Sequence, residues 1–398
     1  MQMQTRTNQK NGEELSILGF GCLRLPTKGR EIDEPRAIAL IHEAIENGVN
    51  YFDTAYIYGN GKNEALLGAA LNGGWREKVK IATKLPPFMV KTLANAKKIM
   101  DTQLLRLQTD SIDYYLLHML TDKAMYDRLS SLGIMEWLEE QKKNGVIKNI
   151  GFSFHGGKMD FELILKSYPW DFCQIQYNYM DENNQATKDG LLLAAEMGIP
   201  VIVMEPLRGG KLVTHLPESV TKEFASQKPE KSSAEWALRW VWDHPQINVV
   251  LSGMSDEDQL AENIRIASTV MPNSLSEEEL QVFERVKTVM HEKTKVPCTG
   301  CGYCMPCPFG VDIPGCFSCY NDKYLMNDKS VRFKYYQTMG TLSKKPAVAS
   351  QCHECGKCEG HCPQKIEIRK QLKTVKRELE GPLYRPVAAI ARKFMHIK

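Results

Sequence analysis

Short runs of β-branched and aromatic residues alternate with amphipathic stretches along the first three quarters of the chain. Apolar side chains spaced three and four residues apart predict helices, and the short apolar runs between them predict buried strands. The predicted strands are residues 18–21, 49–54, 79–84, 111–118, 147–153, 172–178, 200–205 and 249–254. The predicted helices include residues 34–47, 92–107, 134–144, 181–197, 233–244 and 256–268.

A strand followed by a helix, repeated eight times in about 290 residues, is the size and rhythm of a (β/α)8 TIM barrel. We therefore predict an α/β fold in which residues 1–293 form this barrel. A doubly wound open sheet is the alternative. It is disfavoured because no Gly-x-Gly-x-x-Gly follows the first strand, so nucleotide binding would lack its usual phosphate turn.

Polar residues interrupt the apolar runs near the carboxyl ends of the predicted strands. In chain order from the second strand, they are Asp53, Lys84, His118, Ser153, Gln174, Glu205 and Ser252. The carboxyl ends of barrel strands meet at one mouth, which is where barrels of this kind carry out chemistry. The sequence therefore predicts an active site at that mouth.

Ten of the twelve cysteines lie between residues 298 and 362, and eight of them form two runs that each end in Cys-Pro. The first run is Cys298, Cys301, Cys304 and Cys307, and the second is Cys352, Cys355, Cys358 and Cys362. This spacing is typical of proteins with two [4Fe-4S] clusters, in which the last cysteine of each run binds the other run's cluster. Zinc is the alternative metal, but eight thiolates with terminal Cys-Pro exceed what one zinc site needs.

The assignment of ligands to clusters follows from the same pattern. We expect Cys298, Cys301, Cys304 and Cys362 to hold one cube, and Cys352, Cys355, Cys358 and Cys307 to hold the other. The first run has two residues before Cys307 where three are usual, and Cys316 and Cys319 follow nearby. We expect these two cysteines, like Cys22 and Cys173, to be small packing residues.

These runs define a small, mostly helical, ferredoxin-like iron-sulfur domain over residues 294–380, followed by a basic tail over residues 381–398. Residues 1–294 contain 33 basic and 40 acidic side chains, whereas residues 295–398 contain 18 and 8. Part of this basic excess would offset negatively charged clusters, and the rest would attract an acidic ferredoxin or flavodoxin rather than nucleic acid. A solvated basic surface without a partner is the alternative.

The amino-terminal residues 1–12 are polar, and no apolar stretch approaches the roughly 18 residues that a spanning helix needs. We therefore expect a cytoplasmic protein without an integral membrane segment. The basic tail is expected to pack against the protein, with a position on a membrane surface as the alternative.

Three segments together resemble the aldo-keto reductase family over about residues 14–290: Asn50-Tyr-Phe-Asp53-Thr-Ala-Tyr-Ile-Tyr58-Gly59, then Thr83-Lys84, then Tyr115-Leu-Leu-His118. The resemblance implies a catalytic tetrad of Tyr58, Asp53, Lys84 and His118. It also implies reduction of an aldehyde or ketone, or oxidation of the alcohol, with NAD(P)H. Tyr58 would be the general acid, and Lys84 would lower its pKa from about 10. Asp53 would hold Lys84, and His118 would orient the carbonyl oxygen.

The resemblance also implies a nicotinamide site in which Ser153 and Gln174 hold the carboxamide. Met204 stands where the family often has an aromatic ring that stacks on the nicotinamide. Further positions that match the family's cofactor-binding loops are Glu205, Leu207, Ser252, Gly253, Ser255, Gln259, Glu262 and Asn263. NADP(H) is the family expectation. NAD(H) is not excluded, because Gly253 and Gln259 stand where lysine and arginine often bind the 2′-phosphate.

The sequence leaves open the role of the clusters and whether the barrel turns over a substrate. The clusters could relay single electrons toward the barrel or could be structural, and no flavin motif connects them to a two-electron reaction. The alternative function is a redox-sensing or electron-transfer protein whose barrel binds the nucleotide without significant turnover, similar to potassium-channel beta subunits. Radical S-adenosylmethionine chemistry would need three cysteines after the first strand, where only Cys22 is present.

Overall fold

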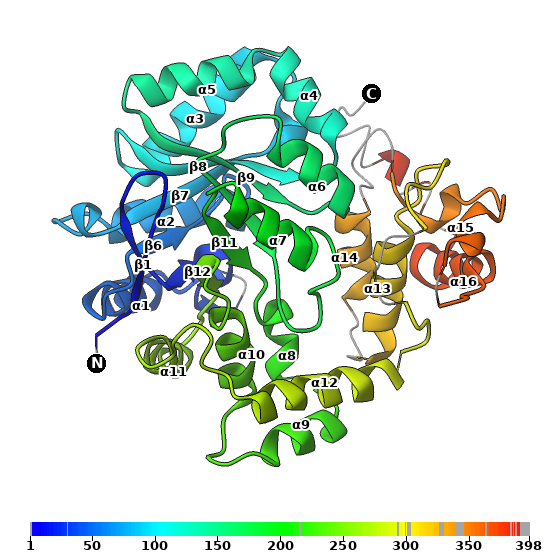
Figure 1. Cartoon of the computed structure of the whole chain (residues 1–398). Coiled ribbons are helices and arrows are strands. Elements are labelled where there is room, and N and C mark those ends of the chain that lie inside the picture. The colour runs from blue at the N-terminus through cyan, green and yellow to red at the C-terminus, as the bar shows by residue number, and fades with distance from the viewer. Residues whose placement is uncertain are drawn as a thin grey trace.

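The computed structural model describes the chain except for residues 1, 30, 215, 293, 299, 301–303, 326–329, 340–345, 363, 383, 385, 387 and 391–398. Eight strands form a closed barrel in the order β3-β6-β7-β8-β9-β10-β11-β12 (Figure 1), and every neighbouring pair that closes it is parallel. The strands are β3 (Leu18–Gly21), β6 (Tyr51–Asp53), β7 (Lys80–Leu85), β8 (Ile112–Leu120), β9 (Ile147–Phe154), β10 (Phe172–Gln176), β11 (Val201–Met204) and β12 (Ile247–Ser252). The predicted TIM barrel is confirmed.

Helices follow the strands and cover the outside of the barrel (Figure 1). They are α1 (Glu34–Glu46), α2 (Lys62–Ala70), α3 (Leu93–Leu107), α4 (Lys123–Ser131), α5 (Ile134–Lys143), α6 (Lys158–Leu165), α7 (Thr187–Glu196), α8 (Lys211–Thr214), α9 (Glu218–Ala225), α10 (Ser233–Trp242), α11 (Glu257–Ala267) and α12 (Glu277–Glu292). A large apolar core between strands and helices holds these layers together.

One helix boundary differs clearly from the prediction. We expected a helix from residue 181, but α7 begins at Thr187. Residues 178–181 instead form a turn, in which Asn178 Oδ1 accepts hydrogen bonds from the backbone N–H groups of Met180 and Asp181. A short polar side chain that bonds the backbone two or three residues later favours a turn over a helix, which explains the difference.

The alternation of side chains along the strands determines which residues face the barrel interior. Tyr51, Ala82, Tyr114, Phe172 and Ile202, one from each of five strands, belong to one buried apolar cluster. Residues two or four positions later along these strands therefore face inward as well, closer to the carboxyl-terminal mouth. These later residues are Asp53, Lys84, His118, Gln174 and Met204.

An amino-terminal hairpin, β1 (Thr5–Thr7) and β2 (Glu14–Ser16), contributes to the other end of the barrel. Leu15 belongs to the interior cluster, and Asn8 Nδ2 donates to the hydroxyl of Tyr114 at 3.0 Å. A second short hairpin pairs β4 (Thr27–Lys28) with β5 (Glu31–Ile32). Because side chains fill the amino-terminal end, the carboxyl-terminal mouth is the end where a ligand can enter the barrel.

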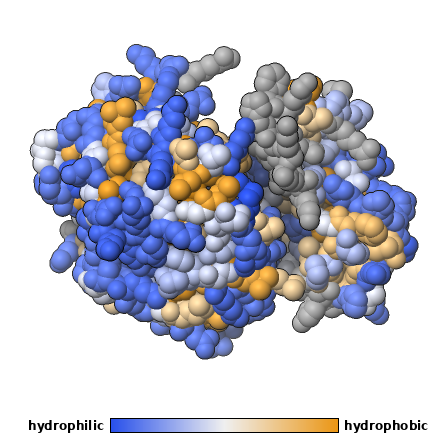
Figure 2. Space-filling model, turned by 90° about the horizontal axis from the view of Figure 1, so that it is seen from above, coloured by the Kyte–Doolittle hydropathy of each residue, from blue (hydrophilic) through white to orange (hydrophobic). Residues whose placement is uncertain are grey.

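The carboxyl-terminal region is helical and lies beside the barrel as a smaller lobe (Figures 1 and 2). Its helices are α13 (Ile313–Leu325), α14 (Val331–Thr338), α15 (Lys357–Gly360) and α16 (Ile368–Val375), and a π-helical turn (Lys376–Glu380) follows. This lobe has an apolar core of its own, against which cysteines of both runs pack. Among the residues that the structure describes, no helix is long and apolar enough to cross a membrane.

Candidate active site

An ion pair between Lys84 and Asp53 lies at the base of the carboxyl-terminal mouth of the barrel. Lys84 Nζ lies 2.5 Å from Asp53 Oδ1 and donates to the carbonyl oxygen of Thr54 at 2.7 Å. Gln174 Nε2 donates to the other carboxylate oxygen of Asp53 at 2.9 Å. Both charged side chains are buried. Burial alone would lower the pKa of Lys84, but the charges and hydrogen bonds of Asp53 and Tyr58 together raise it, so the ammonium group stays charged.

Tyr58 lies in a 3₁₀ turn (Tyr58–Gly61) after β6, with its ring beside the ion pair. The ring centroid is 5.0 Å from Lys84 Nζ and 5.9 Å from the centroid of the His118 ring. Burial raises the pKa of Tyr58, although the charge of Lys84 opposes this shift. Lys84 acts in the expected direction, because its charge and its hydrogen bond to Tyr58 both lower that pKa, and Asp53 has a smaller opposing effect. Burial is the largest influence, so the net pKa of Tyr58 is raised.

His118 faces the same space from β8. Burial and the nearby charge of Lys84 hold its pKa well below the usual range, so the imidazole is neutral near pH 7. Its Nδ1 atom is buried, and no group in the described part of the chain forms a hydrogen bond with it. The structure thus brings Tyr58, Asp53, Lys84 and His118 together around one point, with a neutral imidazole and a protonated phenol facing a charged lysine.

The residues expected to hold the nicotinamide lie around the same mouth. Ser153 is buried, and its Oγ accepts a hydrogen bond from the backbone N–H of Met119 at 2.8 Å. The amide N–H of Gln174 is engaged by Asp53, which leaves its carbonyl oxygen to accept a bond from a carboxamide. Met204 packs on the interior cluster. Glu205 and Leu207 follow it in the loop after β11.

Side chains at the end of β12 and in the loop after it form hydrogen bonds within the loop or with α11, unlike the side chains that face the barrel interior. The buried Ser252 turns its hydroxyl toward α11, where it accepts a hydrogen bond from Asn263 Nδ2 at 3.0 Å. Gln259 Oε1 accepts from the backbone N–H of Ser255 at 3.0 Å, which orders this loop. Glu262 accepts from the hydroxyl of Ser232 at 2.6 Å. Ser252 and Asn263 thus support the loop, whereas the exposed Gly253 is available for a close approach of a ligand.

Arg24, which no sequence motif singles out, lies in the 3₁₀ turn (Cys22–Arg24) after β3. A Cβ atom added to Gly209 would lie 2.6 Å from Arg24 Nη2, and one added to Gly253 would lie 3.3 Å from Arg24 Cβ. Gly209 also has a positive φ of 68°. Glycines of two different loops therefore let the Arg24 side chain pack closely, with the guanidinium against Gly209 and the aliphatic part against Gly253. An exposed guanidinium held in this way could contact a phosphate. No signal in the sequence connects residues so far apart.

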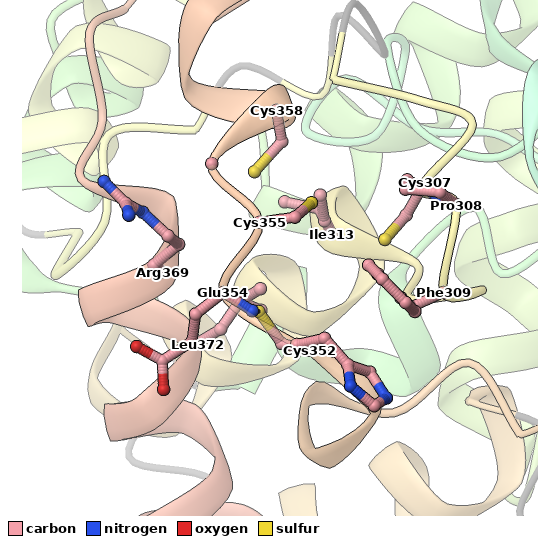
Figure 3. Close-up of a pocket in the computed structure, with 12 residues that line it drawn as sticks. Cys307, Pro308, Phe309, Ile313, Cys352, Glu354, Cys355, Cys358, Arg369 and Leu372 are labelled. Atoms are coloured by element: carbon pink, nitrogen blue, oxygen red, sulfur yellow. The ribbon is translucent and has the colours of Figure 1, made fainter.

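Four cysteines line a pocket in the smaller lobe (Figure 3). Cys352, Cys355 and Cys358 of the second run surround it, and Cys307 of the first run faces them from the opposite side. The pocket contains about 300 Å³ of atom-free space, part of it open to solvent. Four thiols of two runs around one space are the donor set that a [4Fe-4S] cube requires, and this is the grouping that we expected for one of the two cubes.

The other predicted ligand set is only partly described. Cys298, Cys304 and Cys362 are partly buried against the core of the smaller lobe, and Cys301 lies outside the described residues. Cys316 and Cys319 are buried in α13. Among the described residues, no three Cys, His, Asp or Glu side chains converge closely enough to hold a single metal ion.

A buried ionic network joins the smaller lobe to the mouth. Arg208, in the loop after β11, donates to both carboxylate oxygens of Asp181 at 2.8 and 2.9 Å, and its Nη1 lies 3.1 Å from Asp322 Oδ1 in α13. All three side chains are buried. The backbone φ of Arg208 is 46°, in the left-handed region that costs a non-glycine residue energy. These contacts therefore hold the loop of Glu205 and Leu207 in place and attach the smaller lobe to it.

Replacing Arg208 with Met is expected to lower the free energy of unfolding by about 3–5 kcal/mol, because it leaves the buried Asp181 without its paired cation and Asp322 with only the more distant Lys334. A denaturant titration of the full chain measures the effect. The matched control is Arg36→Met, since Arg36 pairs with Glu257 at the surface and both side chains are about half exposed. That control should cost at most about 1 kcal/mol. Equal losses in the two variants would contradict the role given to Arg208.

Comparisons with known proteins agree with this division of the chain. A family model described as the aldo/keto reductase family matches residues 17–284, and one described as a 4Fe-4S dicluster domain matches residues 297–367. The uncharacterized oxidoreductase YqkF of Bacillus subtilis is 28% identical over 301 residues, which cover 68% of this chain and 92% of that protein. Probable aldo-keto reductase 1 of Glycine max is 28% identical over 314 residues, 69% of this chain and 86% of that protein.

Solved structures show the same fold. The holo form of aldo-keto reductase AKR11C1 from Bacillus halodurans is 29% identical, with a TM-score of 0.60, over 71% of this chain and 96% of that one. An aldo-keto reductase from Klebsiella pneumoniae, solved in complex with NADPH, is 22% identical, with a TM-score of 0.59, over 72% of this chain and 96% of that one. The likeness to the Klebsiella pneumoniae structure supports the fold alone.

Proposed function

Because the chain belongs to the aldo/keto reductase family and carries a 4Fe-4S dicluster domain, we propose that it reduces a small aldehyde or ketone to the alcohol with NAD(P)H, or catalyses the reverse reaction. The observation that carries this proposal is the buried Lys84–Asp53 pair, with Tyr58 and His118 beside it at the open end of the barrel. The test is oxidation of NADPH or NADH by anaerobically purified protein in the presence of a panel of aldehydes. Binding of the nucleotide without turnover of any aldehyde would favour the redox-sensing alternative.

Bound NAD(P)H supplies the hydride to the carbonyl carbon. Tyr58 donates its proton to the carbonyl oxygen, and the raised pKa of the phenol keeps that proton in place until the oxygen gains charge. Lys84, held charged by Asp53, stabilises the phenolate that remains. His118 donates a hydrogen bond from its neutral imidazole to the same oxygen and so fixes the orientation of the substrate.

The residues around the mouth fit a nicotinamide dinucleotide. The buried Ser153 and Gln174 would hold the carboxamide, and Met204 would lie against the ring. Gly209 and Gly253 allow the Arg24 side chain to pack closely against both loops, and its guanidinium would bind the pyrophosphate. The fold carries NADPH in the Klebsiella pneumoniae structure, and NADPH is the family expectation for this chain. Neither Gly253 nor Gln259 supplies a cation for the 2′-phosphate, so NADH is the second candidate.

Replacing Arg24 with Ala is expected to raise KM for the dinucleotide about tenfold, because a charge-assisted contact to a phosphate is worth about 1.4 kcal/mol or more. Initial rates at varied NADPH and saturating aldehyde measure this. The control is Lys28→Ala, which removes an exposed cation from the nearby β4–β5 hairpin and should leave KM within about twofold. A tenfold change in KM for the aldehyde instead would show that Arg24 binds the substrate.

The two cysteine runs are proposed to hold two [4Fe-4S] clusters. The clusters could be structural, since the cysteines pack on the core of the smaller lobe and bound metal would stabilise that lobe. They could also exchange electrons with an acidic ferredoxin or flavodoxin, because Cys355 is exposed beside the basic residues Lys357 and Arg369. Full turnover of an aldehyde by folded cysteine-to-serine variants of both runs would exclude the relay.

A further inference from the structure

A second histidine, His155, stands at the mouth beside the tetrad. It follows β9, and its backbone N–H donates to the carbonyl oxygen of Leu120 at 2.8 Å, which continues the ladder between β8 and β9. Side chains alternate along a strand, and the buried Gly151 and Ser153 precede His155 at intervals of two. His155 is therefore placed on the inward side of β9, one step beyond the serine that is proposed to hold the carboxamide.

One nitrogen of the His155 imidazole is buried without a hydrogen bond. Among the residues that the structure describes, none bonds to its Nδ1 atom. Burial and the charges of Lys334 and Lys84 lower the pKa of His155 to about 4, and His155 in turn contributes to the low pKa of His118. The two neutral imidazoles thus lie within electrostatic reach of each other. A buried nitrogen without a hydrogen bond is costly, and a ligand that supplies the missing bond recovers that cost.

The smaller lobe contributes to this part of the mouth through Lys334 of α14. Lys334 Nζ lies 3.6 Å from Asp322 Oδ2, and Asp322 is also held by Arg208. Arg208 in turn is paired with Asp181. The two cations and the two carboxylates of this network therefore balance. Within the described residues of this network no surplus cation remains for a carboxylate beside His155, which favours a neutral oxygen as the group that His155 binds.

We propose that His155 is a second substrate-contacting residue, which hydrogen-bonds a hydroxyl or carbonyl oxygen next to the carbonyl that reacts, under a wall formed by α14 of the iron-sulfur domain. This inference rests on the proposed carbonyl reduction. It assigns the substrate class: a neutral, oxygenated aldehyde or ketone is preferred over an apolar aldehyde and over an aldehyde acid. It also assigns the iron-sulfur domain a role in the substrate site that is independent of electron transfer.

The test compares three aldehydes: glyceraldehyde, 2-methylbutanal, in which methyl groups replace its two hydroxyls, and succinic semialdehyde, which carries a carboxylate. The wild-type protein should have the highest kcat/KM for glyceraldehyde. His155→Leu should lower kcat/KM for glyceraldehyde about tenfold, the value of one buried hydrogen bond, and should change that for 2-methylbutanal by less than about twofold. His155→Asn, which keeps a polar atom near the position of Nδ1, should recover most of the preference.

Other outcomes overturn the inference. An equal loss for glyceraldehyde and 2-methylbutanal in His155→Leu would make His155 a structural residue, and no loss for either would remove it from the site. A wild-type preference for succinic semialdehyde would contradict the inference from the balanced ionic network that a carboxylate is disfavoured in this site. A wild-type protein that binds the dinucleotide but reduces no aldehyde contradicts the proposed function itself, and the inference with it.

Discussion

Replacing Tyr58 with Phe is expected to lower kcat for NADPH-dependent aldehyde reduction by about 10²–10⁴-fold, the usual contribution of a general acid. The variant loses the only atom of this side chain that carries a proton for the carbonyl oxygen, while its ring can still lie beside Lys84 and His118. Dinucleotide affinity should stay within about twofold of the wild-type value, because Tyr58 acts in the transition state rather than in binding. Timed assays of alcohol formation measure kcat, and a fluorescence titration with NADPH measures the dinucleotide affinity.

The control for this variant is Tyr56→Phe, two residues earlier. The ring of Tyr56 packs against the Arg106 guanidinium at 4.5 Å and would keep that contact without its hydroxyl. The control should therefore retain nearly full activity. Equal weak activity in the wild-type protein and in Tyr58→Phe would mean that the barrel binds the nucleotide without meaningful catalysis.

Replacing Cys352, Cys355 and Cys358 together with serine is expected to lower the iron content from about eight to about four atoms per chain. The three thiols surround one pocket with Cys307, so their loss removes one cube and leaves the expected ligands of the other cube in place. Iron and acid-labile sulfide assays after anaerobic reconstitution measure the change. The smaller lobe should also unfold at a lower denaturant concentration, because bound metal contributes to folding.

The control for the cluster variant is the double substitution Cys316→Ala and Cys319→Ala. Both side chains are buried in α13, and Cys316 Sγ lies 3.6 Å from the hydroxyl of Tyr335 in the core of the lobe. Iron content should stay near eight atoms per chain in this control. A fall toward four would show that these cysteines are ligands and that our assignment within the first run is wrong.

The barrel could be predicted from the sequence because its strands are local apolar runs separated by amphipathic helices. The same alternation explains why Asp53, Lys84 and His118, more than 30 residues apart in sequence, face one space. The start of α7 could not be predicted, since it depends on Asn178 closing a turn and on Asp181 meeting Arg208. Such contacts join segments whose proximity only the fold creates.

The candidate site shows the same limit. The direction of the Tyr58 pKa depends on how burial and the Lys84–Asp53 pair compare, and residue types do not contain that information. Ser252 was predicted at the mouth, but register turns its hydroxyl toward Asn263 of α11. Arg24 and His155 carry no motif of their own, and their significance follows only from neighbours in distant loops and, for His155, in the smaller lobe.

The most direct test of the central claim, carbonyl reduction at the tetrad, is a label transfer with the full-length protein. NADPH that carries deuterium at C4 of the nicotinamide ring is incubated anaerobically with glyceraldehyde, and the alcohol is analysed by mass spectrometry. Our account predicts one deuterium on the former carbonyl carbon, and almost none when Tyr58→Phe replaces the wild-type protein. Oxidation of NADPH without deuterium in the alcohol would contradict it.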